Sequence, residues 1–303
     1  MALITVILVT SLVAMLAVSM SFAQHVAMRR TANLLDGDRA MVLALGLEEW
    51  GRQVLIRDNK NGGVSDNLGE NWAMGLPPTA VDNGMVSGSF IDLQGRINLN
   101  NLVSQDADEI AKAELMLTQL FDYCEADNGA DLVQAVADWL DADLNTRPGG
   151  AEDNEYLLHD PPYLAANRPM ISPSELLLVE GVTPELYLCV KDHVTALPSP
   201  TKININTADP VVISTLSPQL LIEDGEEIVR DRPEDGYKDI NDFLTHPRVV
   251  AIGSAMKTDG LTTTSDYFMA QERAVFGKAE IELNSLFSRK RLVEVVRRSI
   301  GTY

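Results

Sequence analysis

Residues 1–24 read MALITVILVTSLVAMLAVSMSFAQ, and no side chain from Ala2 to Gln24 is formally charged. An apolar run of about 20 residues is long enough to cross a bilayer as an α-helix. A cleaved secretory signal is the alternative, because Ser21-Phe22-Ala23 has the small-x-small pattern of a cleavage site. The run exceeds the usual signal core of about 7–15 residues, and no basic stretch precedes it. Residues 1–24 are therefore predicted to be a retained transmembrane helix.

Helical character continues beyond this apolar segment. No proline occurs before Pro77, and Leu43, Leu47, Trp50 and Val54 follow the i, i+4, i+7, i+11 stripe of an amphipathic helix. One helix is predicted from near residue 2 to near residue 58, roughly 80 Å long at 1.5 Å per residue. Residues 25–58 would continue the helix outside the membrane, with the apolar stripe packed on the domain that follows.

Composition limits the classes of function. The chain has 303 residues, 46% of them apolar, which is enough for a packed core besides one membrane segment. A net charge of −20 argues against broad contact with nucleic acid, whose phosphates need a basic surface. Cys124 and Cys189 are too few for a disulfide scaffold or a four-thiolate zinc site. One bridge and two buried free thiols both remain open.

The rest of the chain alternates between strand and helix patterns. Residues 59–89 have the Gly, Asn, Asp, Ser and Pro content of a loop region. Ser89–Leu93 and Arg96–Leu99 alternate around Gln94-Gly95, which predicts a hairpin. Helical spacing follows between residues 103 and 200, and strand-like alternation returns in residues 267–276, 278–287 and 292–296.

These patterns predict an α+β fold in which the long N-terminal helix packs on an antiparallel sheet. The predicted α+β domain comprises residues 59–102 and 201–303. Residues 103–200 would form a large inserted α-helical domain, and the insertion could extend to about residue 250.

An acidic segment is the strongest candidate for a site. Residues 121–160 contain eleven Asp or Glu and one Arg. Asp141 and Asp143 alternate just after a predicted helix end, near Gly149-Gly150, which suits a hard cation that takes six to eight oxygen ligands. Calcium fits best, because magnesium retains its waters and because the chain has no suitable set of Cys and His ligands for zinc. The sequence pattern of an EF-hand is absent. A solvated acidic loop without an ion is the alternative.

Two stretches resemble a known family. Residues 1–6, followed by Arg29-Arg30-Thr31-Ala32-Asn33, look like the mature end of a type IV pilin-like protein whose basic leader is missing from this chain. The segment IDLQGRINLNNL at residues 91–102 resembles the K family of type II secretion minor pseudopilins. Most pilins have Glu at the fifth position, whereas the K family lacks it, and Thr5 matches that departure. A buried membrane carboxylate needs a partner, so Thr5 suits a subunit with no neighbour above it.

The resemblance implies a site and a function. The segments DWLDAD and GAED resemble the calcium-associated part of the K family and imply one or two structural Ca2+ ions. The implied ligands are Asp138, Asp141, Asp143, Glu152 and Asp153. The chain would be a non-enzymatic pseudopilus tip protein that joins minor pseudopilins I and J, starts pseudopilus assembly and serves export of folded proteins across the outer membrane.

The family also implies a single pass through the inner membrane, with the bulk of the chain in the periplasm. Arg29, Arg30 and Arg39 follow the apolar run, and the positive-inside rule by itself would place the C-terminal part in the cytoplasm. The orientation therefore rests on the family and not on these residues.

Other functions were weighed against this one. The chain has no G-x-S-x-G, P-loop or H-E-x-x-H motif, so it is not expected to be an enzyme. Residues 203–208 and 228–244 resemble a helix-hairpin-helix module, but its hairpin is acidic and lacks paired glycines, which indicates a packing unit and not a DNA-binding one. A membrane-anchored, calcium-stabilised periplasmic domain with an unrelated binding role is the second hypothesis.

Overall fold

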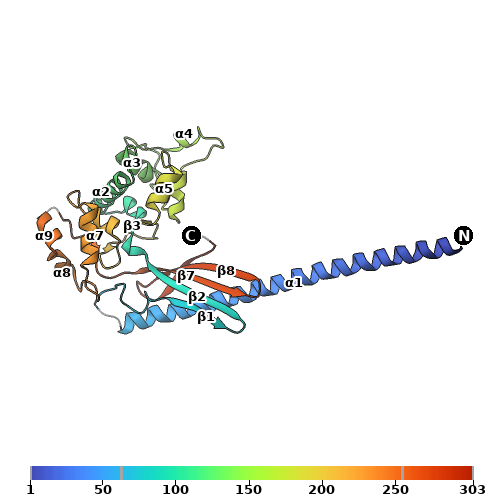
Figure 1. Cartoon of the computed structure of the whole chain (residues 1–303). Helices are drawn as coiled ribbons and strands as arrows, with labels where there is room; N and C mark the ends of the chain where they lie inside the picture. Colours follow the sequence, from blue (N-terminus) through green and yellow to red (C-terminus); the bar gives the residue numbers. More distant parts are fainter. Residues whose placement is uncertain (1, 62–63, 254–255, 302–303) are drawn as a thin grey trace.

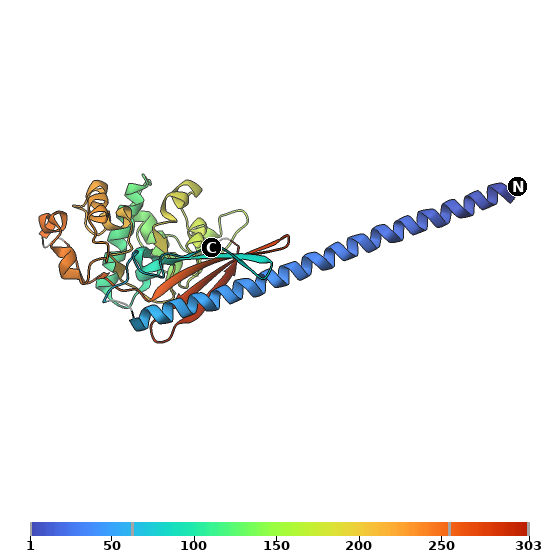
Figure 2. The ribbon, with the colours of Figure 1, turned by 60° about the horizontal axis from the view of Figure 1, so that its bottom comes forward.

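Helix α1 dominates the shape of the molecule. The structure is a computed structural model that describes residues 2–61, 64–253 and 256–301. Helix α1 spans Ala2–Asn61 without interruption, which confirms the predicted single helix. Its N-terminal half projects away from the rest of the chain (Figures 1 and 2). An 18-residue window of this helix has a mean hydropathy of 2.5 and is not buried at all within the chain, as expected for a segment that lies in lipid.

The C-terminal half of α1 packs on a five-stranded sheet. The strands follow the order β1-β2-β7-β8-β9, and every neighbouring pair is antiparallel. Ala44 and Leu47 of α1 contact one part of the sheet and Leu55 another, in two separate apolar clusters. The predicted C-terminal strands are confirmed within a few residues. The strand bounds are β1 Leu76–Val81, β2 Gly84–Asp92, β7 Tyr267–Phe276, β8 Ala279–Ser288 and β9 Glu294–Ile300.

The predicted hairpin around Gln94-Gly95 is wrong. Strand β2 ends at Asp92, and the chain then makes a 3-10 turn, η1 (Leu93–Gly95), in which Asp92 accepts a hydrogen bond from the Gln94 amide at 2.8 Å. The next strand, β3 (Ile97–Asn98), pairs in parallel with β4 (Val194–Thr195). The alternation on the two sides of the turn therefore serves two different, distant partners. Local sequence does not show which partner each strand takes.

A helical lobe is inserted between β2 and β7. Asp92 at the end of β2 is opposite Phe268 on β7, so the lobe leaves and rejoins the sheet at neighbouring positions. The lobe lies at the end of the sheet remote from the N-terminus (Figure 1). Its elements are η2 Leu99–Val103, α2 Ala107–Tyr123, α3 Gly129–Leu140, α4 Asp153–Tyr156, η3 Pro173–Leu178, α5 Pro184–Val190, β5 Ile203–Asn204, α6 Pro210–Ser214, α7 Ile222–Arg230, α8 Ile240–Leu244, α9 Pro247–Ile252 and β6 Leu261–Thr262.

The lobe is longer than the predicted insertion. One hydrophobic cluster contains buried residues from Ile97 to Leu261. Residues 203–261, which the prediction assigned to the sheet domain while allowing the insertion to extend to about residue 250, contribute Val212, Ile228 and Phe243 to this cluster. The short, irregular helices after residue 200 explain the difference, because their apolar residues show no extended helical period.

The lobe contains two units built on the same plan, a first unit (residues 97–195) and a second unit (residues 203–262). Each begins with a two-residue strand that pairs in parallel with a two-residue strand at its end. In the first unit, the Asn100 side chain accepts from the Met170 amide at 2.8 Å and donates to the Met170 carbonyl at 3.0 Å. In the second, Asn206 accepts from the Tyr237 amide at 2.7 Å and donates to its carbonyl at 2.9 Å. Met170 and Tyr237 each lie two residues before the N-cap of the next helix.

A disulfide closes the first unit. Cys124 at the end of α2 is bonded to Cys189 in α5, with their Cα atoms 6.0 Å apart. This bridge resolves the alternative that the sequence left open. It connects parts of the chain that are 65 residues apart.

A buried polar junction joins the second unit to the sheet. The carboxylate of Asp92 accepts hydrogen bonds from the hydroxyls of Thr207 and Ser265, both at 2.6 Å, and from the side-chain amide of Asn204 at 3.0 Å. Burial raises the pKa of Asp92, while these donors oppose the rise. The junction fixes how the lobe meets the end of β2, because a buried carboxylate is stable only where its donors are in place.

Candidate metal centre

The acidic loop begins where α3 ends. Asp138 lies in the last turn of α3 and is fully buried, and the backbone becomes extended at Asp141 (ψ 170°). The Asp141 carboxylate accepts from the Asp143 amide at 3.3 Å, and the Asp143 carboxylate accepts from the Asn145 amide at 2.8 Å. These local hydrogen bonds curl the chain so that carboxylates two residues apart face the same side.

Three carboxylates converge. One oxygen of each of Asp141, Asp143 and Glu152 lies within 4.8 Å of the others. Glu152 is only 1% exposed, and among the described residues neither of its oxygens has a hydrogen-bond partner. Burial, followed by repulsion from Asp138 and Asp141, raises the pKa of Glu152 to about 7. A buried carboxylate with no donor and two acidic neighbours fits a bound cation, which would supply the missing positive charge.

Asp138 is beside this trio and already has a partner. Its Oδ2 accepts from the backbone amide of Arg147 at 3.0 Å, and the Arg147 Nε lies 3.4 Å from its Oδ1. The same guanidinium contacts Asp141 Oδ2 at 3.3 Å. Gly150 passes so close that a Cβ there would lie 2.0 Å from the Asp138 carboxylate, so only glycine fits without a rearrangement.

Asp153 points to a different partner. It is the first residue of α4, and its Oδ1 accepts a hydrogen bond from the Ala165 amide at 3.0 Å. The structure therefore brings together three of the five predicted ligands, Asp141, Asp143 and Glu152. It places Asp138 next to them and Asp153 against the following loop. Ion binding by any of the five stays a prediction.

Aromatic packing positions the two ends of the loop. The rings of Trp139 and Tyr156 meet edge to face at 5.1 Å between centroids, and Tyr156 and Tyr163 lie 5.3 Å apart. The Asn167 amide donates to the Trp139 carbonyl at 3.0 Å. The side-chain oxygen of Asn167 is buried with no partner among the described residues, an oxygen that sequence patterns did not indicate. Rigid aromatic contacts of this kind fix α4 against the end of α3.

The donor set determines the class of ion. All three converging groups are carboxylates, which hard divalent cations prefer, and calcium accepts irregular geometry. A bound cation would neutralise the carboxylates and order the loop. The nearby His159 makes a 2.7 Å contact with Glu180.

A second acidic group was not predicted. Asp58, Asp66 and Glu70 also have oxygens within 4.8 Å of one another. Here the guanidinium of Arg289 already ion-pairs with Asp58 at 2.7 Å and also contacts Asp66. Burial and the neighbouring Glu70 raise the pKa of Asp58 to about 6. Through Arg289 the group links the end of α1 to the segment after β8, and no local sequence pattern could show this link because Arg289 comes from a distant part of the chain.

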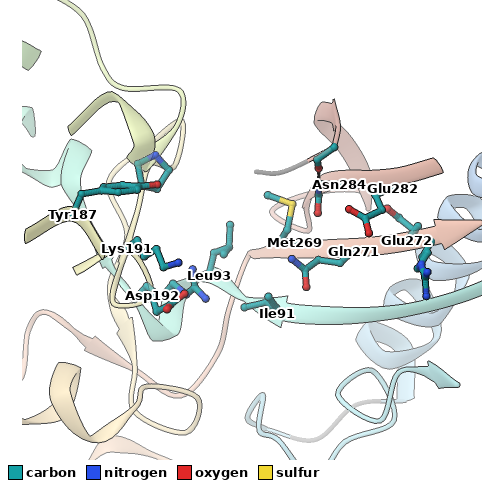
Figure 3. Close-up of a pocket in the computed structure, with 14 residues that line it drawn as sticks. Ile91, Leu93, Tyr187, Lys191, Asp192, Met269, Gln271, Glu272, Glu282 and Asn284 are labelled. Carbon is teal, nitrogen blue, oxygen red and sulfur yellow. Dashed lines mark hydrogen bonds between the residues drawn. The ribbon is translucent and has the colours of Figure 1, made fainter. Parts of the chain in front are cut away.

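A cleft of about 540 Å³ separates the lobe from the outer face of the sheet. Tyr187, Lys191 and Asp192 line it on the lobe side, with Gln271 and Glu282 on the sheet side (Figure 3). Charges of both signs are mixed along its walls. The lining is that of a polar gap between two packed bodies.

Comparison with known proteins identifies the family. Two family models described as type II secretion system protein K match residues 95–199 and 203–264, which nearly coincide with the first and second units. Type II secretion system protein K of Pseudomonas aeruginosa is 33% identical over 99% of this chain and 92% of that protein. The protein of the same name from Aeromonas hydrophila is 32% identical over 95% of this chain and 92% of its own length.

A solved structure agrees with these relatives. A chain from the crystal structure of the GspK-GspI-GspJ complex of the enterotoxigenic Escherichia coli type 2 secretion system superposes with a TM-score of 0.80 at 25% identity. The match covers 90% of this chain and 100% of that chain. This chain therefore belongs to the protein K family of type II secretion systems.

Proposed function

We propose that this chain is a non-enzymatic minor pseudopilin that forms the pseudopilus tip with minor pseudopilins I and J. In this role it starts pseudopilus assembly and supports the export of folded proteins across the outer membrane. The similar solved chain comes from a complex with GspI and GspJ, which supports these partners. One observation carries the proposal: a single helix whose bare apolar half precedes a half that is packed on a sheet, with a large lobe at the far end.

The bare half of α1 serves as anchor and assembly contact in this proposal. It would cross the inner membrane once and leave the sheet and the lobe in the periplasm. The Thr5 hydroxyl donates to the Ala2 carbonyl at 2.8 Å within the helix, so this position needs no partner from another subunit. A subunit without a membrane carboxylate suits the end of a filament, where no further subunit has to be attracted.

The lobe explains why this subunit would stay at the tip. It lies at the opposite end of the sheet from the N-terminus of α1, above any layer of pseudopilins that pack along that helix (Figure 2). A body of this size would occupy the space that a following subunit needs. Calcium at Asp141, Asp143 and Glu152 would be structural in this function, because it orders a loop of the lobe and touches no reacting group.

Co-expression of the full chain with tagged I and J tests the assembly. We expect the three proteins to co-purify from detergent-solubilised membranes. A chain that never associates with I and J would contradict the tip assignment and favour the unrelated binding role.

Removing the lobe tests the capping role. Replacing residues 94–266 by a two-residue turn is feasible because Asp92 and Phe268 are opposite each other in the ladder, which leaves Leu93 opposite Tyr267. We expect this variant to co-purify with I and J, since α1 and the sheet remain. Pseudopili assembled with it should be longer than those with the full chain; unchanged lengths would show that the lobe does not limit addition.

A further inference from the structure

A narrow crevice lies between α1 and the ribbon formed by β1 and β2. Its walls are mostly apolar, its floor contains a carboxyl group, and its volume is about 20 Å³. That volume accommodates one group the size of a water molecule. Its lining includes Trp50, Trp72, Gly75, Gly88, Phe90 and Glu272.

Glu272 on β7 makes no ion pair of its own among the described residues, because the nearby Arg298 pairs with Glu48. Glu272 is 3% exposed, and neither oxygen has a hydrogen-bond partner among the described residues. The polar groups nearest to Glu272 donate their hydrogen bonds to Glu48 of α1 instead. The Ser285 hydroxyl on β8 donates to Glu48 at 2.7 Å, and the Arg298 guanidinium on β9 donates to Glu48 at 2.9 Å. Burial first, and Glu48 second, raise the pKa of Glu272 to about 9, against the opposing effects of Ser285 and Arg298. One arginine thus faces two carboxyl groups.

Glycines allow the walls of the crevice to approach closely. A Cβ at Gly51 would lie 2.9 Å from the Phe90 ring, and a Cβ at Gly75 would lie 2.9 Å from the Gly88 carbonyl. Gly75 also has a φ of +65°, which larger residues rarely adopt. A side chain at either position would have to push the wall opposite it away.

Aromatic rings form the walls. Trp50, at the mouth, is 46% exposed, whereas Trp72 is 1% exposed and packs edge to face on Phe268. Phe90 completes the lining. Aromatic faces attract cations, and the attraction grows where water is excluded.

We propose that this crevice binds one primary ammonium group, the side chain of a lysine from a partner pseudopilin, as the counter-charge of Glu272. The identity of the partner as a pseudopilin rests on the proposed function, whereas the choice of an ammonium group follows from the size and charge of the crevice. A compact ammonium matches the volume, whereas a planar guanidinium is larger. The crevice opens beside α1, the element through which this chain is proposed to meet its neighbours.

Binding is coupled to a proton. Glu272 is protonated in the free chain at neutral pH, and it must release that proton to solvent before it pairs with a cation. The affinity for an ammonium group is therefore expected to rise with pH up to about 9. A water molecule in the crevice would release no proton.

The first experiment uses n-butylammonium, a mimic of the lysine side chain, on the full chain in detergent. Calorimetry at pH 7.5 in two buffers of different ionisation enthalpy should show close to one proton released per amine bound. Glu272→Gln should abolish binding, and Glu282→Gln, on the exposed outer face of the sheet, should leave it unchanged. The melting temperature of Glu272→Gln, no lower than that of the native chain, serves as the folding control. Equal effects of n-butylammonium and n-butanol, or binding without proton release, would overturn the site.

The second experiment concerns the partner. In complexes with I and J, Glu272→Gln should weaken association about tenfold, and Trp50→Ala should weaken it less, because it removes one wall but leaves the charge. Unchanged affinity in both variants would overturn the partner lysine as occupant. Failure of the native chain to assemble with I and J would count against the proposed function, and the butylammonium experiment would still decide the crevice.

Discussion

The two units of the lobe share a polar frame and differ in what is built on it. In both, a buried asparagine binds the amide and the carbonyl of one residue just ahead of a helix, and two short strands close the unit in parallel. The family models that match the chain divide it at the same place. A common frame with separate matches indicates one structural plan used twice.

The additions are confined to the first unit. Its helices α2 and α3 have 17 and 12 residues, whereas the four helices described in the second unit have 5 to 9. The disulfide and the acidic loop also belong to the first unit. A long loop rich in carboxylates is costly to order, and the cross-link and an ion both lower that cost. The asparagine frame therefore defines the unit, and the first unit needs further restraints because of its loop.

Removing the frame should have the largest effect. Asn100→Ala leaves the Met170 amide, the Met170 carbonyl and the Leu197 carbonyl without this partner, and Asn206→Ala leaves two groups of Tyr237. At about 1–3 kcal/mol per buried unpaired group, we expect losses of about 3–5 kcal/mol for the first unit and about 2–4 kcal/mol for the second. Hydrogen exchange of each unit, with melting temperature, measures both.

The exposed Asn241→Ala in α8 is the matched control and should change stability by less than about 0.5 kcal/mol. If Asn206→Ala changed stability as little as this control, the second unit would not depend on its asparagine. The two units would then share their backbone arrangement but not the source of their stability.

Much of the fold was accessible to sequence patterns because it is periodic. The uncharged run and the apolar stripe of α1 predicted a helix that the structure confirms, and the alternation after residue 267 predicted three strands. The hairpin at Gln94-Gly95 failed because β3 pairs with β4, almost a hundred residues later. Sequence patterns indicated a helix-hairpin-helix packing unit within the second unit, but they did not show that it belongs to the lobe, because its helices are too short to show a period.

The candidate site was predictable in its location and less so in its geometry. Density of charge located the loop, and the structure brings Asp141, Asp143 and Glu152 together. Sequence spacing could not show that the Arg147 guanidinium pairs with Asp138, or that the Ala165 amide donates a hydrogen bond to the Asp153 carboxylate. Such partners are set by tertiary contacts, as is the arrangement of Glu272 beside α1.

Loss of the disulfide should rank second. Replacing Cys124 and Cys189 by serine frees a loop of 65 residues in the unfolded chain, for an expected loss of about 2–4 kcal/mol. The loss should be confined to the first unit, which Trp139 fluorescence reports, while exchange in the second unit changes less. An equal increase of hydrogen exchange in both units would mean that the lobe unfolds cooperatively, and that the disulfide of the first unit stabilises the whole lobe.

Glu152 should affect stability with a sign that depends on calcium. Its pKa in the folded chain, about 7, exceeds the ordinary value of 4.5, so its stabilising contribution is complete below about pH 4.5 and is lost as pH rises through 7. In chelator at pH 8, Glu152→Gln should therefore increase the free energy of unfolding by about 1 kcal/mol and raise the melting temperature accordingly. With calcium present the native chain should be the more stable one.

Asp153→Asn is the matched control for this test, because Asp153 lies outside the converging trio and pairs with the Ala165 amide. It should keep a calcium-dependent rise in melting temperature, whereas Asp141→Ala with Asp143→Ala should lose it. A native chain that shows no rise with calcium would leave the acidic loop as a solvated one.

Substitution of Arg147 should have the smallest effect on stability. It distinguishes the contribution of the arginine from that of a bound ion. Its guanidinium contacts Asp138 and Asp141, so it is a partial counter-charge where an ion would bind. It is partly exposed, and in chelator Arg147→Met should cost only about 0.5–1 kcal/mol. With saturating calcium the difference should shrink, because the ion neutralises the same carboxylates. Titration of melting temperature with calcium measures both values. A loss that stays constant with calcium would show that Arg147 and the ion act on different groups, and that the first unit depends on its arginine independently of any ion.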